Sequence, residues 1–288
     1  MLQHPYSAMS GGQWMRGNLH THTTASDGRR PHQTVIDDYA SRGYGFLEIS
    51  DHDIYTSGAD YKAYESRGMV LIPGNEVTAN GPHVLQVGGA GIVKPSAERQ
   101  VAIDDIAASG GSAIFNHPNW QSNFSHCPQQ LLEDSEGYLG IEIYNGVVRR
   151  LQGSPYATDR WDRLLSEGRN IWGFANDDSH IAEDVARGWN VAYVKKPNLD
   201  GVLDALRTGR FYASTGVLIR AIRVEGMRIG LETENAERIV ALKDWGERVD
   251  TVDGSDIFID VPEQASYVRF ECWGRGESFA WTQPIFIR

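Results

Sequence analysis

The chain of 288 residues is 41% hydrophobic and 23% charged and has no biased tract, which excludes a disordered or fibrous protein. Its formal net charge of -11 disfavours binding along a nucleic-acid backbone, because phosphate contacts need clustered Lys and Arg and no basic run occurs. A small anionic substrate stays compatible with this charge, since metal cations bound at a carboxylate-rich site reverse the local sign.

Short apolar runs alternate with longer polar or amphipathic stretches from residue 17 to about residue 195. This rhythm indicates strands separated by loops and helices. We expect the strands to be parallel and most of them to be buried on both faces. The predicted strands cover residues 46–49, 69–72, 83–87, 112–115, 139–143, 170–174 and 191–194.

Helices are predicted between these strands, and each ends near a glycine that can adopt a left-handed cap. Pro31 stands in the first turn of the earliest one, which favours a helix start there. The predicted helices cover residues 31–42, 98–108, 158–167 and 199–208, followed by Gly43, Gly110, Gly168 and Gly209.

The character of the chain changes after Gly216. Helical periodicity is lost, and residues alternate in polarity at 219–225, 267–273 and 284–287, with Gly- and Asp-bearing turns between them. We place a boundary near residues 212–216. Residues 1–212 are predicted to form the main domain, and residues 213–288 a small antiparallel β-rich domain packed on it.

The informative feature is where the polar residues fall. Nearly every apolar run is followed at once by His, Asp or Glu, the residue types that bind divalent metals or move protons. In a closed parallel barrel the carboxyl ends of the strands meet on one face, so these distant stretches would converge there. Each motif alone is as consistent with a turn that satisfies backbone groups. The residues concerned include His20, His22, His52, Glu76, His117, Asp178 and His180.

Taken in chain order, these motifs resemble those of the PHP family, the polymerase and histidinol phosphatase superfamily of metal-dependent hydrolases. The segment NLHTHT at 18–23 with SDG at 26–28 is similar to the first motif, and SDH at 50–52 to the second. HP at 117–118 is similar to the third motif, and DSH at 178–180 to the last. The order and number of the motifs make the resemblance specific.

The resemblance implies an α/β fold, a distorted (β/α)7 TIM-like barrel that here carries the small C-terminal antiparallel β unit. It also implies about two or three divalent ions, Zn, Mn or Fe, and the mixed imidazole and carboxylate donors suit all of these metals. The metal ligands that it implies are His20, His22, Asp27, His52, Glu76, His83, His117, Asp178 and His180.

The segment LDALRTGRFYASTG at 203–216 and the β-rich tail ending in PIFI are similar to the CehA/McbA-like branch of the superfamily. Some of that branch hydrolyse carbamate esters of aromatic alcohols, whereas most characterised relatives elsewhere act on phosphate esters. We expect a metal-dependent hydrolase that uses a metal-activated hydroxide, in the first place a phosphoesterase for a small phosphomonoester or phosphodiester. A carbamate, carboxylic ester or amide hydrolase and a noncatalytic metal-binding domain stay open as alternatives.

Catalytic roles are expected for Asp178, His180 and His117. A ligand histidine usually donates its second ring N–H to an acceptor outside the metal site, and we expect Asp51, Asp53 or Asp177 to be such an acceptor. Asp177 is equally consistent with a surface or turn carboxylate. Substrate contacts are less specific, since each candidate also fits a surface ion pair or a helix end. These candidates are Arg187, Arg210, Ser214 and Asn145.

Cys127 and Cys272 stand far apart without a second thiol nearby, so we expect both to be free. The N-terminal residues show no basic segment followed by an apolar one, and no apolar run reaches ~18 residues, which predicts a cytoplasmic protein without a membrane span. The expected partner is a small molecule. The oligomeric state is open.

Overall fold

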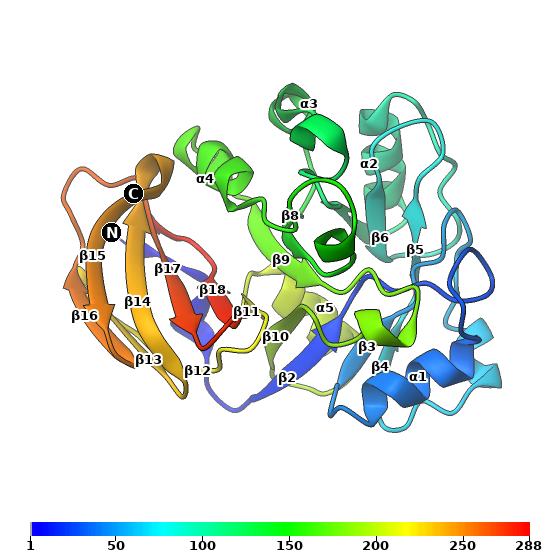
Figure 1. The fold of residues 1–288 in the computed structure, drawn as a ribbon, viewed down its shortest axis with the longest axis horizontal. Helices are drawn as coiled ribbons and strands as arrows, with labels where there is room; N and C mark the ends of the chain where they lie inside the picture. The colour runs from blue at the N-terminus through cyan, green and yellow to red at the C-terminus, as the bar shows by residue number, and fades with distance from the viewer. Residues whose placement is uncertain (1) are drawn as a thin grey trace.

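A computed structural model describes residues 2–288 of the protein (Figure 1). These residues form a mixed α/β structure in which strands outnumber helices. The strands of this part form one eleven-stranded, one five-stranded and one three-stranded sheet. The predicted α/β class is therefore confirmed.

The eleven-stranded sheet joins both ends of the chain. It contains β1 (Leu2–Gln3), β2 (Gln13–Asn18), β3 (Phe46–Glu48), β4 (Val70–Ile72), β10 (Trp189–Val194), β11 (Phe211–Ser214), β14 (Ala236–Lys243), β15 (Glu247–Asp253), β17 (Tyr267–Gly274), β18 (Phe279–Thr282) and β19 (Ile285–Ile287). Its path runs β1-β19-β17-β18-β11-β10-β2-β3-β4, and β14 branches from β17 and carries β15. β2, β3 and β4 are parallel, and β10 is antiparallel to β2.

The five-stranded sheet comprises β5 (Gly74–Val77), β6 (Val84–Gly88), β7 (Gly111–Phe115), β8 (Gly140–Asn145) and β9 (Trp172–Asn176). β7, β8 and β9 are parallel, whereas β6 is antiparallel to both β5 and β7. Only residues 78–83 connect β5 to β6, and a parallel connection needs a dozen residues or more. The expectation of parallel strands is thus wrong for β6 and β10, and β5 is a strand that the sequence did not predict.

Two isolated parallel bridges connect the two large sheets. Thr21 at the end of β2 pairs with Ser179 after β9, and His52 after β3 pairs with Glu76 in β5. The two bridges thereby bring the ends of β2 and β3 beside β9 and β5. Two single bridges are weaker evidence for barrel closure than continuous strand pairing. A closed (β/α)7 barrel stays a prediction.

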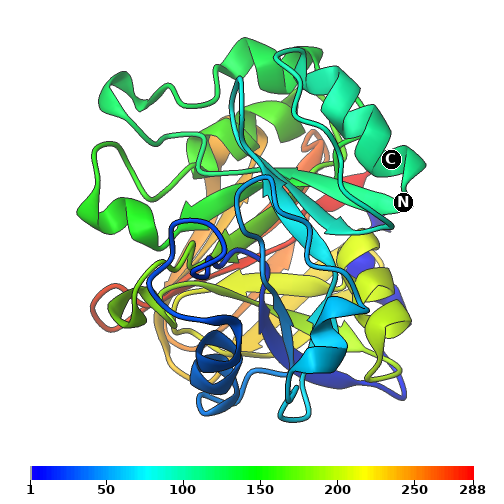
Figure 2. The same cartoon turned by 90° about the vertical axis from the view of Figure 1, so that its right-hand side faces the viewer.

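Helices lie outside the strands, as Figure 2 shows for α1, α2 and α5. The four predicted helices are confirmed, with ends that shift by at most two residues. A short helix, α3, was missed because six residues contain too little periodicity to recognise. The helices are α1 (His32–Ala40), α2 (Arg99–Ala108), α3 (Gln129–Asp134), α4 (Thr158–Ser166) and α5 (Leu199–Arg207).

The C-terminal residues form antiparallel strands, as their alternation predicts. β12 (Ile219–Glu225), β13 (Arg228–Thr233) and β16 (Asp256–Asp260) make the three-stranded sheet. Buried side chains of this sheet pack in one core with those of β14 and β17. Because β11 pairs with β10 on one side and β18 on the other, the eleven-stranded sheet continues across residue 212. The domain division at that residue stays a prediction.

Two smaller expectations concern cysteines and membranes. Cys127 and Cys272 are buried and free, which confirms the prediction for both thiols. Across residues 2–288, every helix is too short or too polar to cross a lipid bilayer.

Candidate metal centre

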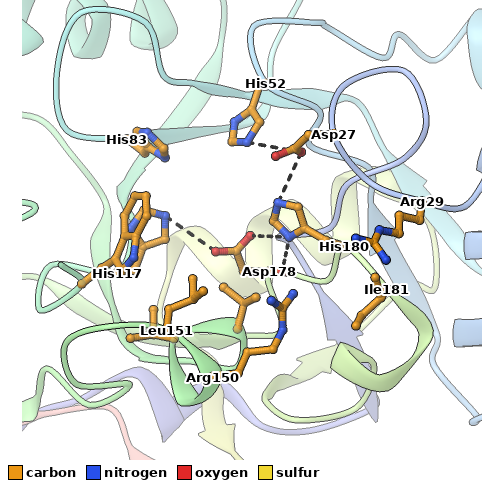
Figure 3. Close-up of a pocket in the computed structure, with 13 residues that line it drawn as sticks. Asp27, Arg29, His52, His83, His117, Arg150, Leu151, Asp178, His180 and Ile181 are labelled. Atoms are coloured by element: carbon orange, nitrogen blue, oxygen red, sulfur yellow. Dashed lines mark hydrogen bonds and ion pairs between the residues drawn. The ribbon is translucent and has the colours of Figure 1, made fainter.

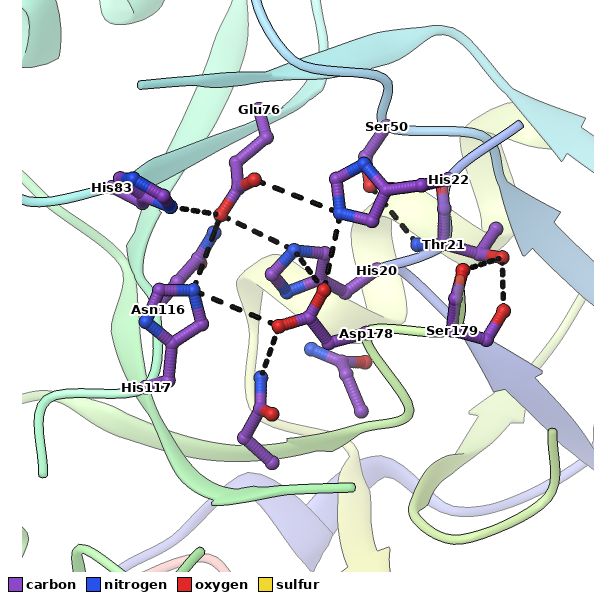
Figure 4. A network of polar contacts seen from close by, with 12 residues as sticks. His20, Thr21, His22, Ser50, Glu76, His83, Asn116, His117, Asp178 and Ser179 are labelled. Carbon is purple, nitrogen blue, oxygen red and sulfur yellow. Dashed lines mark hydrogen bonds and ion pairs between the residues drawn. The ribbon is translucent and has the colours of Figure 1, made fainter. Parts of the chain in front are cut away.

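The nine predicted ligands come together in one cluster. Figure 4 shows His20, His22, Glu76, His83, His117 and Asp178, and Figure 3 shows Asp27, His52 and His180. His20 and His22 follow β2, His52 follows β3, and His117 follows β7, so strand ends place these side chains as expected. Asp178 and His180 follow β9 in the same way. Asp27 reaches the group from the loop that follows β2.

Glu76 is the shared centre of the group. It is fully buried, and its two carboxylate oxygens lie within 3.6 Å of ring nitrogens from five histidines. A carboxylate in this position can bridge two cations. The nitrogen–oxygen distances are 3.2 Å for His20, 3.6 Å for His22, 2.8 Å for His52, 3.1 Å for His83 and 3.4 Å for His117.

Glu76 and His83 reach the site differently from the expectation. Glu76 lies inside β5 and His83 directly precedes β6, so neither follows the carboxyl end of a strand. Since β6 is antiparallel to β7, Val84 pairs with Phe115, and the start of β6 lies beside the end of β7. The reversal of β6 therefore brings His83 to the edge where His117 emerges.

Asp178 and Asp27 complete the group from two sides. Asp178 Oδ1 lies 3.3 Å from His20 Nε2 and 3.1 Å from His22 Nε2. Asp27 Oδ1 lies 3.5 Å from His52 Nε2 and 3.3 Å from His180 Nε2. His22 and His180 each lie within 3.9 Å of both carboxylates, so the two aspartates share these histidines.

Backbone strain marks two of these positions. His117 has φ 27° and Asp178 has φ 54°, both in the left-handed region that residues other than glycine rarely adopt. Such strain costs about 1–3 kcal/mol per residue and collects at functional sites. It indicates that the side-chain positions of His117 and Asp178 are selected for function and against local stability.

The donor atoms fit divalent cations. Several buried ligand atoms have no hydrogen-bond partner within residues 2–288, namely His20 Nε2, both ring nitrogens of His22, His52 Nδ1, His117 Nδ1 and Glu76 Oε2. Buried polar atoms are ordinarily paired, because leaving them unpaired is costly. Imidazole and carboxylate donors together suit Zn, Mn and Fe. The residues present therefore fit a centre for more than one divalent ion.

Glu142 in β8 holds His20 from behind. Its Oε1 accepts a hydrogen bond from His20 Nδ1 (2.8 Å), and its Oε2 accepts from the backbone N–H of His117 (2.9 Å). A carboxylate only accepts, so the proton is on Nδ1 of His20, and Nε2 is free to bind a cation. Glu142 was not predicted as a site residue. Its carboxylate within an otherwise apolar strand could have indicated a role there.

Replacing Glu142 with alanine should weaken metal binding about 10–100-fold, because His20 then loses the acceptor that orients its ring. Competition with a chelator of known affinity measures this loss. Glu142→Gln is the matched variant, since its amide oxygen can still accept from His20, and its loss should be smaller. Equal affinity of the alanine variant and the unchanged protein would refute the role.

The other expected acceptors serve the loops. Asp51 accepts from the backbone N–H and the hydroxyl of Thr23 (2.7 and 2.6 Å), and Asp53 binds Thr78 and Ala79 in the same way. Asp177 accepts from the backbone N–H groups of residues 186–188, and burial raises its pKa to about 6. The turn interpretation of Asp177 is confirmed, and the expectation that these three carboxylates orient ligand histidines is wrong.

Gly28 sits between Asp27 and Arg29, packed against the chain. A Cβ on Gly28 would lie 2.5 Å from the carbonyl oxygen of His22. Gly28→Ala should therefore lower the free energy of unfolding by about 1–3 kcal/mol, measured by urea denaturation. Gly58→Ala is the control, because nothing lies within 4 Å of its added methyl group. Equal stability of both variants would contradict the close packing.

A cavity of about 370 Å³ opens over the metal ligands (Figure 3). Asp27, His52, His83, His117, Asp178 and His180 line one side of it. Trp120, Val147, Val148, Leu151, Ile181, Arg29 and Arg150 complete the lining, and the Trp120 ring packs against His117 with centroids 5.1 Å apart. Val147, Val148 and Arg150 lie in a short 3-10 helix, Val147–Arg150, and the other four lie in loops. None of the seven carries a sequence pattern that identifies it in advance.

The substrate contacts expected from the sequence lie elsewhere. Arg210 is buried and paired with Asp204, because β11 turns it back toward α5. Ser214 is buried and donates to the carbonyl oxygen of Val217 (2.7 Å), and Arg187 donates to that of Glu183 (3.0 Å). These three do not line the cavity. Asn145 is buried and donates to Glu142 and Asp178 (2.8 and 3.2 Å), so it supports the carboxylates from below.

His126 lies beside the nine predicted ligands and was not itself predicted as a site residue. Its ring lies beside those of His83 and His117, with centroids 4.5 and 4.6 Å away. Burial lowers the pKa of His126 to about 2, and its neutral Nε2 accepts a hydrogen bond from the backbone N–H of His83 (3.0 Å). His126 therefore fixes the start of β6.

No protein-family model and no curated protein matches the sequence. The chain is similar over its whole length to a two-domain protein from Bacteroides vulgatus, whose crystal structure contains a predicted PHP-like metal-dependent phosphoesterase. The sequence identity is 15%, the TM-score is 0.58, and the match covers 90% of that protein's chain. A lesion-specific endonuclease from Pyrococcus furiosus is 13% identical with a TM-score of 0.49, over 68% of this chain and 56% of that one. An amidohydrolase from Chromobacterium violaceum is 16% identical with a TM-score of 0.42, over 57% and 87%. The chain thus shares its fold with a protein that contains a PHP-like domain.

Proposed function

We propose that this protein is a metal-dependent hydrolase of the PHP type, acting as a phosphoesterase on a small phosphomonoester or phosphodiester. The observation that carries the proposal is the convergence of Glu76 with eight other histidine and carboxylate side chains, beside a cavity of small-molecule size. The CehA/McbA-like branch is proposed from the segment at 203–216 and the β-rich tail.

The chemistry needs cations at this centre. Divalent ions bound there lower the pKa of water, polarise the electrophile and neutralise the negative charge of the transition state. His20, His22, Glu76 and Asp178 hold them from the buried side. His180 donates from Nδ1 to the carbonyl oxygen of Asp178 (2.8 Å), which leaves Nε2 facing Asp27 and the cavity.

The cavity side of the centre is where substrate is handled. His117 and His180 both line the cavity, so one ring edge of each is accessible to a substrate above the ligands. We propose that these two histidines and Asp178 stand next to the bond that is broken.

Arg29 at the cavity edge favours a phosphate ester over a carbamate, whereas Arg150 is paired with Asp184. A phosphate ester is an anion, for which guanidinium groups are well suited, whereas a carbamate or carboxylic ester is neutral. The apolar wall of the cavity is the observation that supports the second candidate, a carbamate, ester or amide hydrolase. A noncatalytic metal-binding domain has no use for an open cavity over the ligands.

A substrate panel tests the proposal. The protein is purified with Mn or Zn, and turnover is measured for p-nitrophenyl phosphate, bis(p-nitrophenyl) phosphate and 1-naphthyl N-methylcarbamate. We expect turnover of at least one phosphate ester and its loss on chelation. Turnover of the carbamate alone would replace the phosphoesterase by the second candidate.

A further inference from the structure

The cavity beside the predicted metal ligands has a lining of mixed chemistry. Apart from those ligands and two arginines, it is lined by an apolar wall of Trp120, Val147, Val148, Leu151 and Ile181. A cavity that only admitted phosphate and water would gain nothing from an apolar wall, since uncovered apolar surface is unfavourable in water. The wall therefore indicates that an apolar part of the substrate covers it.

Two loops are paired to build this wall. Trp120, in the loop after β7, forms a bridge with Gly153, in the loop after β8. Backbone hydrogen bonds from Gln121 to Gln152 (3.0 Å) and from Ser154 to Asn119 (2.9 Å) hold the loops together. The wall is thus a preformed surface. Leu151, which lines the cavity, is 41% exposed, so a substrate in the cavity can cover it.

The two arginines at the edge differ in availability. Arg150 donates from Nε and Nη2 to both oxygens of Asp184 (2.9 Å each), and Asp184 in turn accepts from the backbone N–H of His180 (3.0 Å). Arg150 therefore stabilises the His180 loop. Arg29 is exposed, and among residues 2–288 its guanidinium has no hydrogen bond or ion pair. Its own backbone N–H donates to the carbonyl oxygen of His180 (2.8 Å), which anchors it beside the centre (Figure 3).

From these observations, and resting on the proposed phosphoesterase function, we propose that the substrate is a phosphomonoester of a small apolar alcohol. Arg29 pairs with a non-bridging phosphate oxygen while the ester bond faces the metal ligands. The organic group lies against Trp120, Leu151 and Ile181. The cavity of about 370 Å³ is at the lower end of the range for ligand sites, which leaves room for one small organic group.

The reaction balances without a further reactant. Water attacks phosphorus, the bond from phosphorus to the alcohol oxygen breaks, and the alcohol leaves with a proton taken from the attacking water. The products are inorganic phosphate and the free alcohol. Neither oxidant nor reductant is involved.

Two substrates isolate the contribution of the wall. Benzyl phosphate and glycerol 1-phosphate are both esters of primary alcohols, so their leaving groups are of similar basicity and differ mainly in polarity. We expect kcat/KM to be roughly tenfold or more higher for benzyl phosphate, mostly through a lower KM. Leu151→Asn should remove most of this preference. Leu218→Asn is the matched control, because Leu218 is 40% exposed but lies outside the cavity.

Arg29 is tested with the same pair of esters. Arg29→Gln should raise KM for both phosphates about tenfold or more, since each loses a charge-assisted hydrogen bond. Arg275→Gln, at another exposed arginine, should leave KM unchanged. Equal kcat/KM for the two esters, unaltered by Leu151→Asn, would overturn the inference while the phosphoesterase function stands. Turnover of neither ester nor of p-nitrophenyl phosphate by the metal-loaded protein would overturn both.

Discussion

Replacing Glu76 with glutamine should release bound metal and lower kcat/KM for phosphate esters by roughly a thousandfold or more, because bound cations supply several kcal/mol and each 1.36 kcal/mol is a factor of ten. The carboxylate of Glu76 is fully buried and lies within 3.6 Å of five imidazoles, so its loss affects more of the predicted ligands than the loss of either aspartate. Glutamine keeps its shape and loses its charge.

Metal content by mass spectrometry and steady-state kinetics measure these two effects. Glu48→Gln is the matched control, because Glu48 is equally buried and its carboxylate oxygens have no hydrogen-bond partner within the described chain. Burial raises the pKa of Glu48 well above its usual value, so the group is neutral and an amide replaces it without a change of charge. Full metal content and activity in Glu76→Gln would refute the central role of Glu76.

The second large effect concerns stability. Asp162→Asn should lower the free energy of unfolding by about 3 kcal/mol, because the buried guanidinium of Arg269 then keeps only the longer contact with the carboxylate of Glu271 (3.4 Å). Arg269 is 1% exposed and donates from Nε and Nη2 to the two oxygens of Asp162 (2.7 and 2.6 Å). The hydroxyl of Tyr267 donates to the same carboxylate (2.9 Å). This pair joins α4 to β17.

Urea denaturation followed by circular dichroism measures the loss. Asp253→Asn is the control, because Asp253 pairs with Arg238 on the surface, where both side chains are largely exposed and solvent screens the charges. No measurable change is expected for this control. A similar small change in Asp162→Asn would show that the contact with Arg269 does not hold the two parts together.

The strand-end rule predicted where most ligands lie. His20, His22, His52, His117 and Asp178 each follow a short apolar run, and chain direction alone carries them to one edge of the sheets. Glu76 and His83 lie at the site but do not follow the carboxyl end of a strand, because β5 and β6 form an antiparallel hairpin. A single sequence shows the apolar run of β6 but not the direction in which it pairs.

Other parts of the site depend on partners that are distant in sequence. Arg210 was predicted to bind an anionic substrate, but its guanidinium is paired with the carboxylate of Asp204. Arg29 looked ordinary, and only the fold shows that it is exposed at the cavity without a partner. Glu142 was hidden within a strand that reads as apolar. In each case the decisive information is which side chain lies opposite, and periodicity does not encode it.

Metal content in the purified protein and thermal unfolding with and without a chelator show whether the nine predicted ligands bind metal. We expect about two or three transition-metal ions per chain and a lower melting temperature after chelation, because ions that bind only the folded state stabilise it. Protein that is purified in the presence of Mn or Zn, holds no such ion and melts at the same temperature with chelator would contradict the metal centre.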